Sequence, residues 1–179
     1  MHSSKNPQRP PVLPGPGGGS YLDWSTHIRV KKHEFGESFT VFIFLGDVPE
    51  DPDEWYSSPS YVGDHNVMVF RSGGVKRPEE DSFVQGVVHM NKAIVARSGL
   101  LSLDEDVVVP YIEEKLAWRV RTVAGECLEL DEGTSLEVTV FSVRVSMGPI
   151  SDPSTIPSHG EPRYYHHITA GRPGGARPQ

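Results

Sequence analysis

Cysteine is nearly absent from this sequence of 179 residues, and long apolar runs are absent altogether. Cys127 is the single cysteine, which excludes a disulfide within the chain and a zinc site built on several thiolates. No base stands beside Cys127 in the sequence, so a half-buried strand residue is favoured over a nucleophile. No stretch approaches the ~18 apolar residues of a membrane helix, and the N-terminus lacks the apolar core of a signal peptide. We therefore expect a reducing, cytoplasmic setting.

Basic residues are fewer than acidic residues. The sequence has 17 Lys and Arg residues and 24 Asp and Glu residues, which gives a net charge of -7. Binders of nucleic acid or of membrane surfaces need clustered positive charge. The short basic stretches "RVKK" and "GRPGGARPQ" are typical of a solvated strand face and a loose end. We expect neither a nucleic acid nor a membrane as a partner.

The two ends of the chain differ in composition from its middle. Residues 1–20 and 149–179 are rich in Pro, Gly and Ser, a composition that buries too little apolar surface to offset the entropy of ordering. We predict a disordered arm over residues 1–20, one domain over residues 21–148 and a flexible tail over residues 149–179. Histidines in the tail stretch "YYHH" are assigned to that flexible segment.

The middle of the chain is a series of short strands. In "WSTHIRVKKHEF", Trp24, Ile28 and Val30 alternate with polar residues, as in a strand with one buried face. "SFTVFIFLG" is almost continuously apolar and predicts a strand buried on both faces. Further strands are predicted in "YVGDHNVMVF", "SFVQGVVHM", "LAWRVRTV" and "TSLEVTVFSVRVSMG". Helical turns are expected near residues 91–96 and 109–116, with Pro110 tolerable only in a first turn. This pattern indicates an all-β fold, an antiparallel β-sandwich with one or two short helices.

One stretch, "HNVMVFRSGGVKRPEEDSFVQGVVHM", raises the question of a metal site. It places His65 and His89 in two strand-like runs, with Glu79, Glu80 and Asp81 in the connection between them. If the runs form a hairpin, the two imidazoles lie nearly opposite one another, ~5 Å apart at Cβ, and can share an ion. A loop carboxylate would complete the set. The alternative is that both histidines serve in the core or in cross-strand hydrogen bonds.

Other chemical motifs are missing. No two histidines are spaced three or four residues apart, as a copper site on helices requires, and no Walker A or G-x-S-x-G motif occurs. The acidic run "PEDPDEW" does not match an EF-hand loop.

Several segments resemble the C-terminal domain of fungal tyrosinases, which is related to the β-sandwich domain of molluscan haemocyanins. The resemblance covers about Tyr21 to Val145 and is carried by "FLGDVPEDPDEW", "YVGDH" and "PYIEEKLAWRV". Two departures stand out. The helical domain that carries the copper histidines of a tyrosinase is not in this sequence, so the resemblance implies that the chain does not oxidise phenols. The Cys-x-x-Cys pair that the family uses in copper handling is replaced by the acidic connection "RSGGVKRPEED", and carboxylates with imidazole suit zinc better than Cu(I).

A haemocyanin-like chain of this size also resembles the cyclopenases of fungal quinolone alkaloid biosynthesis. That resemblance implies a zinc-dependent lyase, which converts a cyclopenin-type benzodiazepinedione to a viridicatin-type quinolone by ring contraction with loss of methyl isocyanate. We predict His65, His89 and Glu79 as ligands of Zn²⁺, and Glu80 as the catalytic acid/base or a fourth ligand. Candidate stacking surfaces for an alkaloid substrate are Tyr61, Phe70 and Trp118, although core packing would explain each of them.

Two other functions fit the same family. The chain can be a non-enzymatic homologue of the tyrosinase tail that shields or assists a copper protein, since the family's tail covers an active site. It can also be a relic without activity. A homo-oligomer formed through uncovered strand edges is compatible with every alternative.

Overall fold

The alternation after Trp24 forms β1 (Gly19–Lys31), a strand of 13 residues. The computed structural model describes residues 19–70, 82–100, 102–149, 151–152 and 154–178. Trp24, Ile28 and Val30 are fully buried, which confirms the predicted face. β1 begins two residues inside the arm predicted over residues 1–20, because Gly19 and Ser20 pair with the end of a later strand, β7 (Glu137–Met147). Residues 1–18 lie outside the described part.

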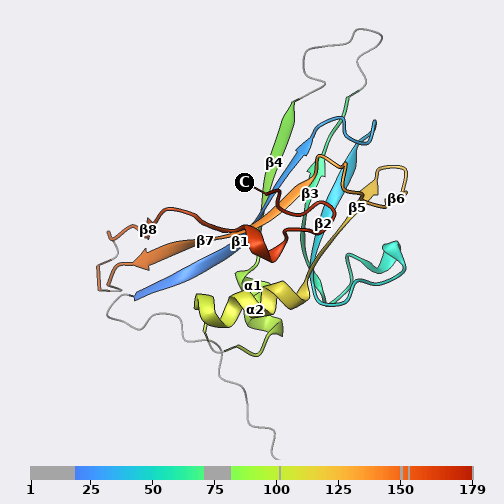
Figure 1. Cartoon of the computed structure of the whole chain (residues 1–179). Helices are drawn as coiled ribbons and strands as arrows, with labels where there is room; N and C mark the ends of the chain where they lie inside the picture. Colours follow the sequence, from blue (N-terminus) through green and yellow to red (C-terminus); the bar gives the residue numbers. More distant parts are fainter. Residues whose placement is uncertain (1–18, 71–81, 101, 150, 153, 179) are drawn as a thin grey trace, which may run out of the picture.

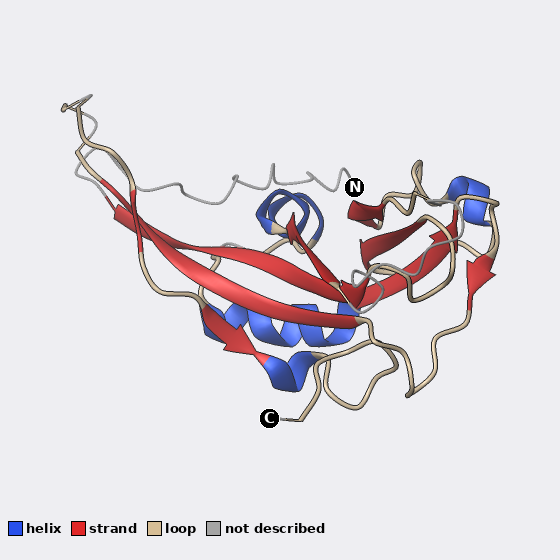
Figure 2. Cartoon of the chain, turned by 90° about the horizontal axis from the view of Figure 1, so that it is seen from above, coloured by secondary structure: helices blue, strands red, loops and turns tan. Residues whose placement is uncertain are grey.

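The strands assemble into two antiparallel sheets, as Figure 1 shows. The first sheet has the order β4-β1-β7-β8, with β9 also paired to β7, and the second has the order β3-β2-β5-β6. Their bounds are β2 (Phe39–Leu45), β3 (Tyr61–Val67), β4 (Phe83–His89), β5 (Leu116–Thr122), β6 (Cys127–Leu128), β7 (Glu137–Met147), β8 (Ser158–His159) and β9 (Arg163–Tyr165). The antiparallel β-sandwich predicted from the sequence is confirmed. In the view from above, the strands run the length of the molecule and the helices are short (Figure 2).

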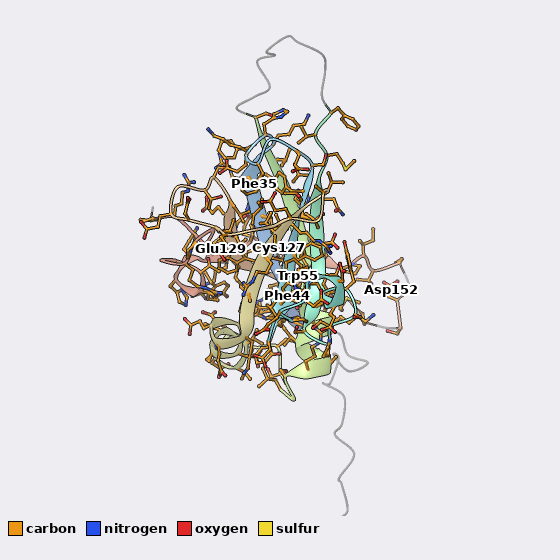
Figure 3. All side chains as sticks on the ribbon, turned by 90° about the vertical axis from the view of Figure 1, so that its right-hand side faces the viewer. Phe35, Phe44, Trp55, Cys127, Glu129 and Asp152 are labelled. Atoms are coloured by element: carbon orange, nitrogen blue, oxygen red, sulfur yellow. The ribbon has the colours of Figure 1, made fainter. Side chains whose placement is uncertain are left out.

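The central strand β2 is buried on both faces, as its apolar run predicts. Val41 and Ile43 point into the core between the sheets and are fully buried. Phe42 and Phe44 point the other way, where the ring of Trp55 covers them at centroid distances of 5.1 and 5.8 Å. Trp55 follows the short 3-10 helix η1 (Pro52–Glu54), so the proline-rich acidic loop serves as a lid over the outer face of the second sheet (Figure 3).

Two helices close one end of the sandwich (Figure 1). They are α1 (Asn91–Arg97) and α2 (Glu105–Lys115). The expectation that Pro110 stands in a first turn is wrong, because α2 begins at Glu105 and contains the proline. Pro110 and Asp106 are both exposed, so water can reach the Asp106 carbonyl that the missing N–H of Pro110 leaves unpaired.

The C-terminal segment is folded against the first sheet, which corrects the prediction of a flexible tail over residues 149–179. Tyr165 of β9 is buried, and its ring lies 5.0 Å from that of Trp24. The hydroxyl of Thr169, also buried, donates to the carbonyl of Val138 at 2.7 Å and accepts from a backbone N–H of the chain end. These contacts are specific and long-range, whereas our prediction rested on composition.

The helices of the described part are short. None of them is long and apolar enough to cross a membrane.

Candidate functional site

His65 lies on β3, an edge strand, and its side chain turns toward β4. A Cβ built on Gly86 of β4 would fall 2.3 Å from its Nδ1 atom, so the ring packs directly against the backbone of β4. The Nε2 atom of His65 is buried and has no hydrogen-bond partner among the described residues. Burial lowers the pKa of this imidazole, and the charge of Asp64 partly opposes the shift.

His89 lies on β4 and points to the outer surface. It stands opposite Ser25 of β1, and its Nδ1 atom lies 3.0 Å from the Ser25 hydroxyl and 3.8 Å from Oδ2 of Asp23. Its side chain is 73% exposed. This histidine makes the cross-strand contact that the sequence allowed as an alternative to metal binding.

The structure does not bring His65 and His89 together. The prediction that these two strands form a hairpin is wrong, because β3 pairs with β2 in one sheet and β4 pairs with β1 in the other. The two runs are edge strands of different sheets, so one imidazole faces the interior and the other faces solvent. Glu79, Glu80 and Asp81 lie outside the described residues, and their predicted roles stay predictions.

The donors that are described do not fit a zinc ion. No group of three or more His, Cys, Asp or Glu side chains that could hold a metal occurs in residues 19–70, 82–100, 102–149, 151–152 and 154–178. A zinc site requires three or four such donors at ~2.0–2.3 Å. The orphaned Nε2 of His65 is a single donor, and the remainder of the set would have to come from residues 71–81.

The three candidate stacking residues have different environments. Tyr61 donates a hydrogen bond from its hydroxyl to Asp64 at 2.6 Å, and burial together with this bond raises the pKa of the phenol. Trp118 is buried, and its Nε1 donates to the carbonyl of Pro173 at 3.0 Å. Phe70 is 75% exposed just beyond the end of β3. Tyr61 and Trp118 therefore pack as structural residues, while Phe70 is free to contact a partner.

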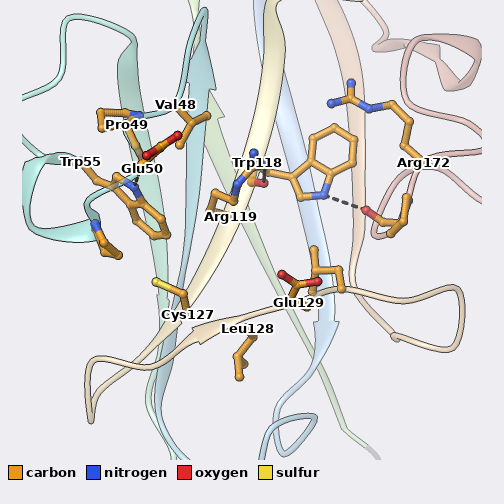
Figure 4. Close-up of a pocket in the computed structure, with 13 residues that line it drawn as sticks. Val48, Pro49, Glu50, Trp55, Trp118, Arg119, Cys127, Leu128, Glu129 and Arg172 are labelled. Carbon is orange, nitrogen blue, oxygen red and sulfur yellow. Dashed lines mark hydrogen bonds between the residues drawn. The ribbon is translucent and has the colours of Figure 1, made fainter.

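A pocket of about 550 Å³ lies at the opposite edge of the second sheet, beside β5 and β6 (Figure 4). Trp55 and Trp118 form two of its walls, and Arg119 and Arg172 reach it from β5 and from the C-terminal segment. Cys127 on β6 also lines it and is exposed, which corrects the half-buried position expected for this residue. β6 is a two-residue strand at the edge of the second sheet. Sequence analysis missed this site because its parts come from three distant segments.

Comparison with known proteins identifies the family. The model of the tyrosinase C-terminal domain family matches residues 23–140, and the chain belongs to this family. The resemblance seen in the sequence is thereby confirmed.

The relatives are tyrosinases of much greater length. A tyrosinase of Neurospora crassa is 30% identical over 200 aligned positions, which cover 99% of this chain and 28% of that protein. A tyrosinase of Podospora anserina is 39% identical over 49 positions, 27% of this chain and 8% of that protein. The chain thus spans less than a third of the length of these relatives.

Solved structures show the same fold. Recombinant mushroom tyrosinase matches with a TM-score of 0.55 at 20% identity, over 80% of this chain and 26% of that one. A crystal that contains latent and active mushroom tyrosinase matches with a TM-score of 0.57 at 18% identity, over 82% of this chain and 26% of that one.

Proposed function

We propose that this chain is a shielding domain for a tyrosinase-type copper catalytic domain, in the same polypeptide or in a separate chain. The observation that carries the proposal is the family match over residues 23–140, together with alignment of nearly the whole chain to only 28% of a tyrosinase. The remainder of such a protein is the part that a C-terminal domain can cover. The solved neighbours include latent and active forms of a tyrosinase, which is compatible with a covering role.

The end of β3 supplies a surface suited to that role. Val67 points inward and is 3% exposed, whereas Met68 and Phe70 point outward and are 57% and 75% exposed. Large apolar side chains that are exposed to solvent are candidates for burial against a partner protein. We therefore assign the contact with the catalytic domain to Met68 and Phe70.

The test is inhibition in trans. A tyrosinase catalytic domain without its own C-terminal domain is mixed with this chain, and oxidation of a phenol is followed at increasing concentrations of the chain. We expect saturable inhibition that the double variant M68S/F70S weakens by roughly tenfold or more, the size of loss that buried anchor residues produce. The matched control is Val123→Ser, since Val123 is 76% exposed at a different place. Absence of inhibition, or equal inhibition by M68S/F70S, would refute the shielding role.

The zinc-dependent lyase is the second candidate. The observation in its favour is the buried Nε2 atom of His65, which has no partner in the described part of the chain. His89 points away from it, so the predicted ligand set would depend on Glu79, with Glu80 as the acid/base. Elemental analysis and incubation with cyclopenin test this candidate directly. About one zinc per chain and formation of a quinolone, detected by mass, would support it; metal-loaded, folded protein without product would exclude it.

We also infer a reducing, cytoplasmic setting. The support for this inference is that Cys127 is the single cysteine of the sequence and that the fold needs no disulfide.

A further inference from the structure

The outer face of the first sheet carries aromatic side chains that the core does not use. Trp24 and the residues that alternate with it along β1 are buried in the core, so the residues between them, with their pairing partners on β4 and β7, point outward. Tyr164 of β9 contacts three other rings on this face at centroid distances of 5.5, 5.8 and 6.5 Å. Together they form the ring cluster, which consists of His27, Phe141, Tyr164 and His166. Tyr164 and the outward Val87 of β4 are 45% and 47% exposed, as at a surface that contacts a partner.

A hollow of about 210 Å³ adjoins the ring cluster. It is lined by Arg29, Glu137 and Thr139 together with three rings of the cluster. Glu137 also accepts a hydrogen bond from the backbone N–H of Arg177 at 3.4 Å. A cavity of ~150 Å³ can hold benzene, so the hollow can receive an aromatic ring. Phe141, the fourth ring of the cluster, stands two residues beyond Thr139 on β7 and is not part of the lining.

Two opposite charges lie at equal distances from the centre of the same face. Asp23 and Arg29 both point outward from β1, each three residues from Thr26. Both side chains lie on the β4 side of the strand. Oδ2 of Asp23 is 3.8 Å from Nδ1 of His89, and the guanidinium carbon of Arg29 is 3.4 Å from the centre of the Phe83 ring. Along this side of β1 the face is therefore negative toward one end and positive toward the other.

We propose that two copies of this chain form a symmetric dimer through these faces. A two-fold axis that lies between the facing sheets, perpendicular to β1 at the level of Thr26, places Asp23 of each copy opposite Arg29 of the other. It also places Phe141 of each copy opposite the hollow beside Thr139 of the other, because Phe141 and Thr139 stand on either side of that level. One axis thus matches both charge and shape, and an interface of this isologous kind closes with two copies.

The size of the contact sets its strength. At ~3.4 Å per residue and ~4.8 Å per strand, β1 from Tyr21 to Lys31 and its neighbouring strands present roughly 500 Å² per copy. About 1,000 Å² in total is at the low end for a specific interface. We therefore expect a reversible dimer with a Kd of about 1–100 μM. This dimer does not depend on the shielding function, and it uses the face of a sheet rather than a strand edge.

The first test is sedimentation velocity of the full chain from about 1 to 300 μM, a range that brackets this Kd. A reducing agent is present, so that the exposed Cys127 cannot link two copies. We expect the sedimentation coefficient to rise from that of a monomer to that of a dimer, and the dimer to weaken in about 1 M NaCl because salt screens the facing charges. A monomer at every concentration would overturn the proposal.

A charge exchange tests the alignment of the two copies. Arg29→Asp alone, or Asp23→Arg alone, places like charges opposite one another and should weaken the dimer by about tenfold or more. The double variant D23R/R29D restores opposite charges and should dimerise within about threefold of the parent chain. Its two positions lie about 20 Å apart along β1, so a pair within one copy cannot explain the recovery. Arg119→Asp, an exposed position on β5 of the other sheet, is the control and should dimerise like the parent.

The ring cluster is tested separately. Tyr164→Ser removes a partly exposed ring and should weaken the dimer by about tenfold. The matched control is Tyr56→Ser, because Tyr56 is 58% exposed over the outer face of the second sheet. Circular dichroism checks that each variant is folded, and either single charge reversal is sufficient if the other does not fold. A dimer that tolerates both Tyr164→Ser and a single charge reversal, or a double variant as weak as the single ones, would refute this interface.

Discussion

Substituting Gly86 by alanine tests a close approach between the two sheets. An added Cβ would lie 2.3 Å from Nδ1 and 2.4 Å from Cγ of His65, whereas ordinary contacts between heavy atoms are ~3.5–4.0 Å. The clash involves the inner atoms of the ring, which can withdraw only if β3 moves or if the His65 side chain leaves its place. The φ angle of Gly86 is not positive, so the cost to an alanine is steric alone.

Two opposing terms set the magnitude. Overpacking of a closely packed site costs about 1–3 kcal/mol. Replacing glycine with alanine also reduces the entropy of the unfolded chain, which stabilises by about 0.4–1 kcal/mol. The net loss in the free energy of unfolding is then roughly 0–2.6 kcal/mol. For a domain of this size that corresponds to a fall in Tm of up to roughly 10 °C.

The assay is urea unfolding, followed by tryptophan fluorescence, in a double-mutant cycle with His65→Ala. In the His65→Ala background the ring is gone, so Gly86→Ala should cost nothing or stabilise slightly, and the two substitutions should be strongly coupled. Gln85→Ala, at an exposed neighbouring position of β4, is the control and should change stability by less than about 0.5 kcal/mol. An equal loss in both backgrounds would refute the packing of His65 on β4.

Three further expectations concern stability. Burial lowers the pKa of His65 in the folded chain, so the unfolded chain binds more protons in this pH range. The contribution of His65 to the free energy of unfolding is therefore fully present above about pH 6.5 and is lost as pH falls through the folded pKa. The loss is at most about 1.4 kcal/mol per pH unit. His65→Gln should flatten this dependence in urea midpoints measured between pH 7.5 and 5. Gly175→Ala should release the C-terminal segment, since its Cβ would lie 1.9 Å from the carbonyl oxygen of Thr169; faster amide exchange in residues 158–178 would show this. Glu34→Gln should cost about 1–3 kcal/mol, because the carboxylate accepts hydrogen bonds from both the N–H and the hydroxyl of Ser135.

Each of these expectations has a contrary result. An identical pH profile in the parent chain and in His65→Gln would show that His65 is not the group that titrates. Protection from exchange that survives in Gly175→Ala would contradict the close fit of the C-terminal segment. A Glu34→Gln chain as stable as the parent would mean that Ser135 finds an equal partner elsewhere.

Strand faces were predictable from the sequence because they depend on a local property. Alternation placed Trp24, Ile28 and Val30 on the buried side of β1, and the unbroken apolar run of β2 indicated burial on both faces. The cover on the outer face of β2 was not predictable in detail, since Trp55 reaches Phe42 and Phe44 through the turn at η1.

Strand pairing and the fate of the C-terminal segment were not predictable by the same reasoning. Alternation is the same whether the connection after β3 turns back within one sheet or crosses to the other, so it could not distinguish a hairpin from two edge strands. The segment around Tyr165 and Thr169 has a composition typical of a loose tail. Its order comes from contacts with Trp24 and Val138, which lie far away in the sequence and leave no periodic signal.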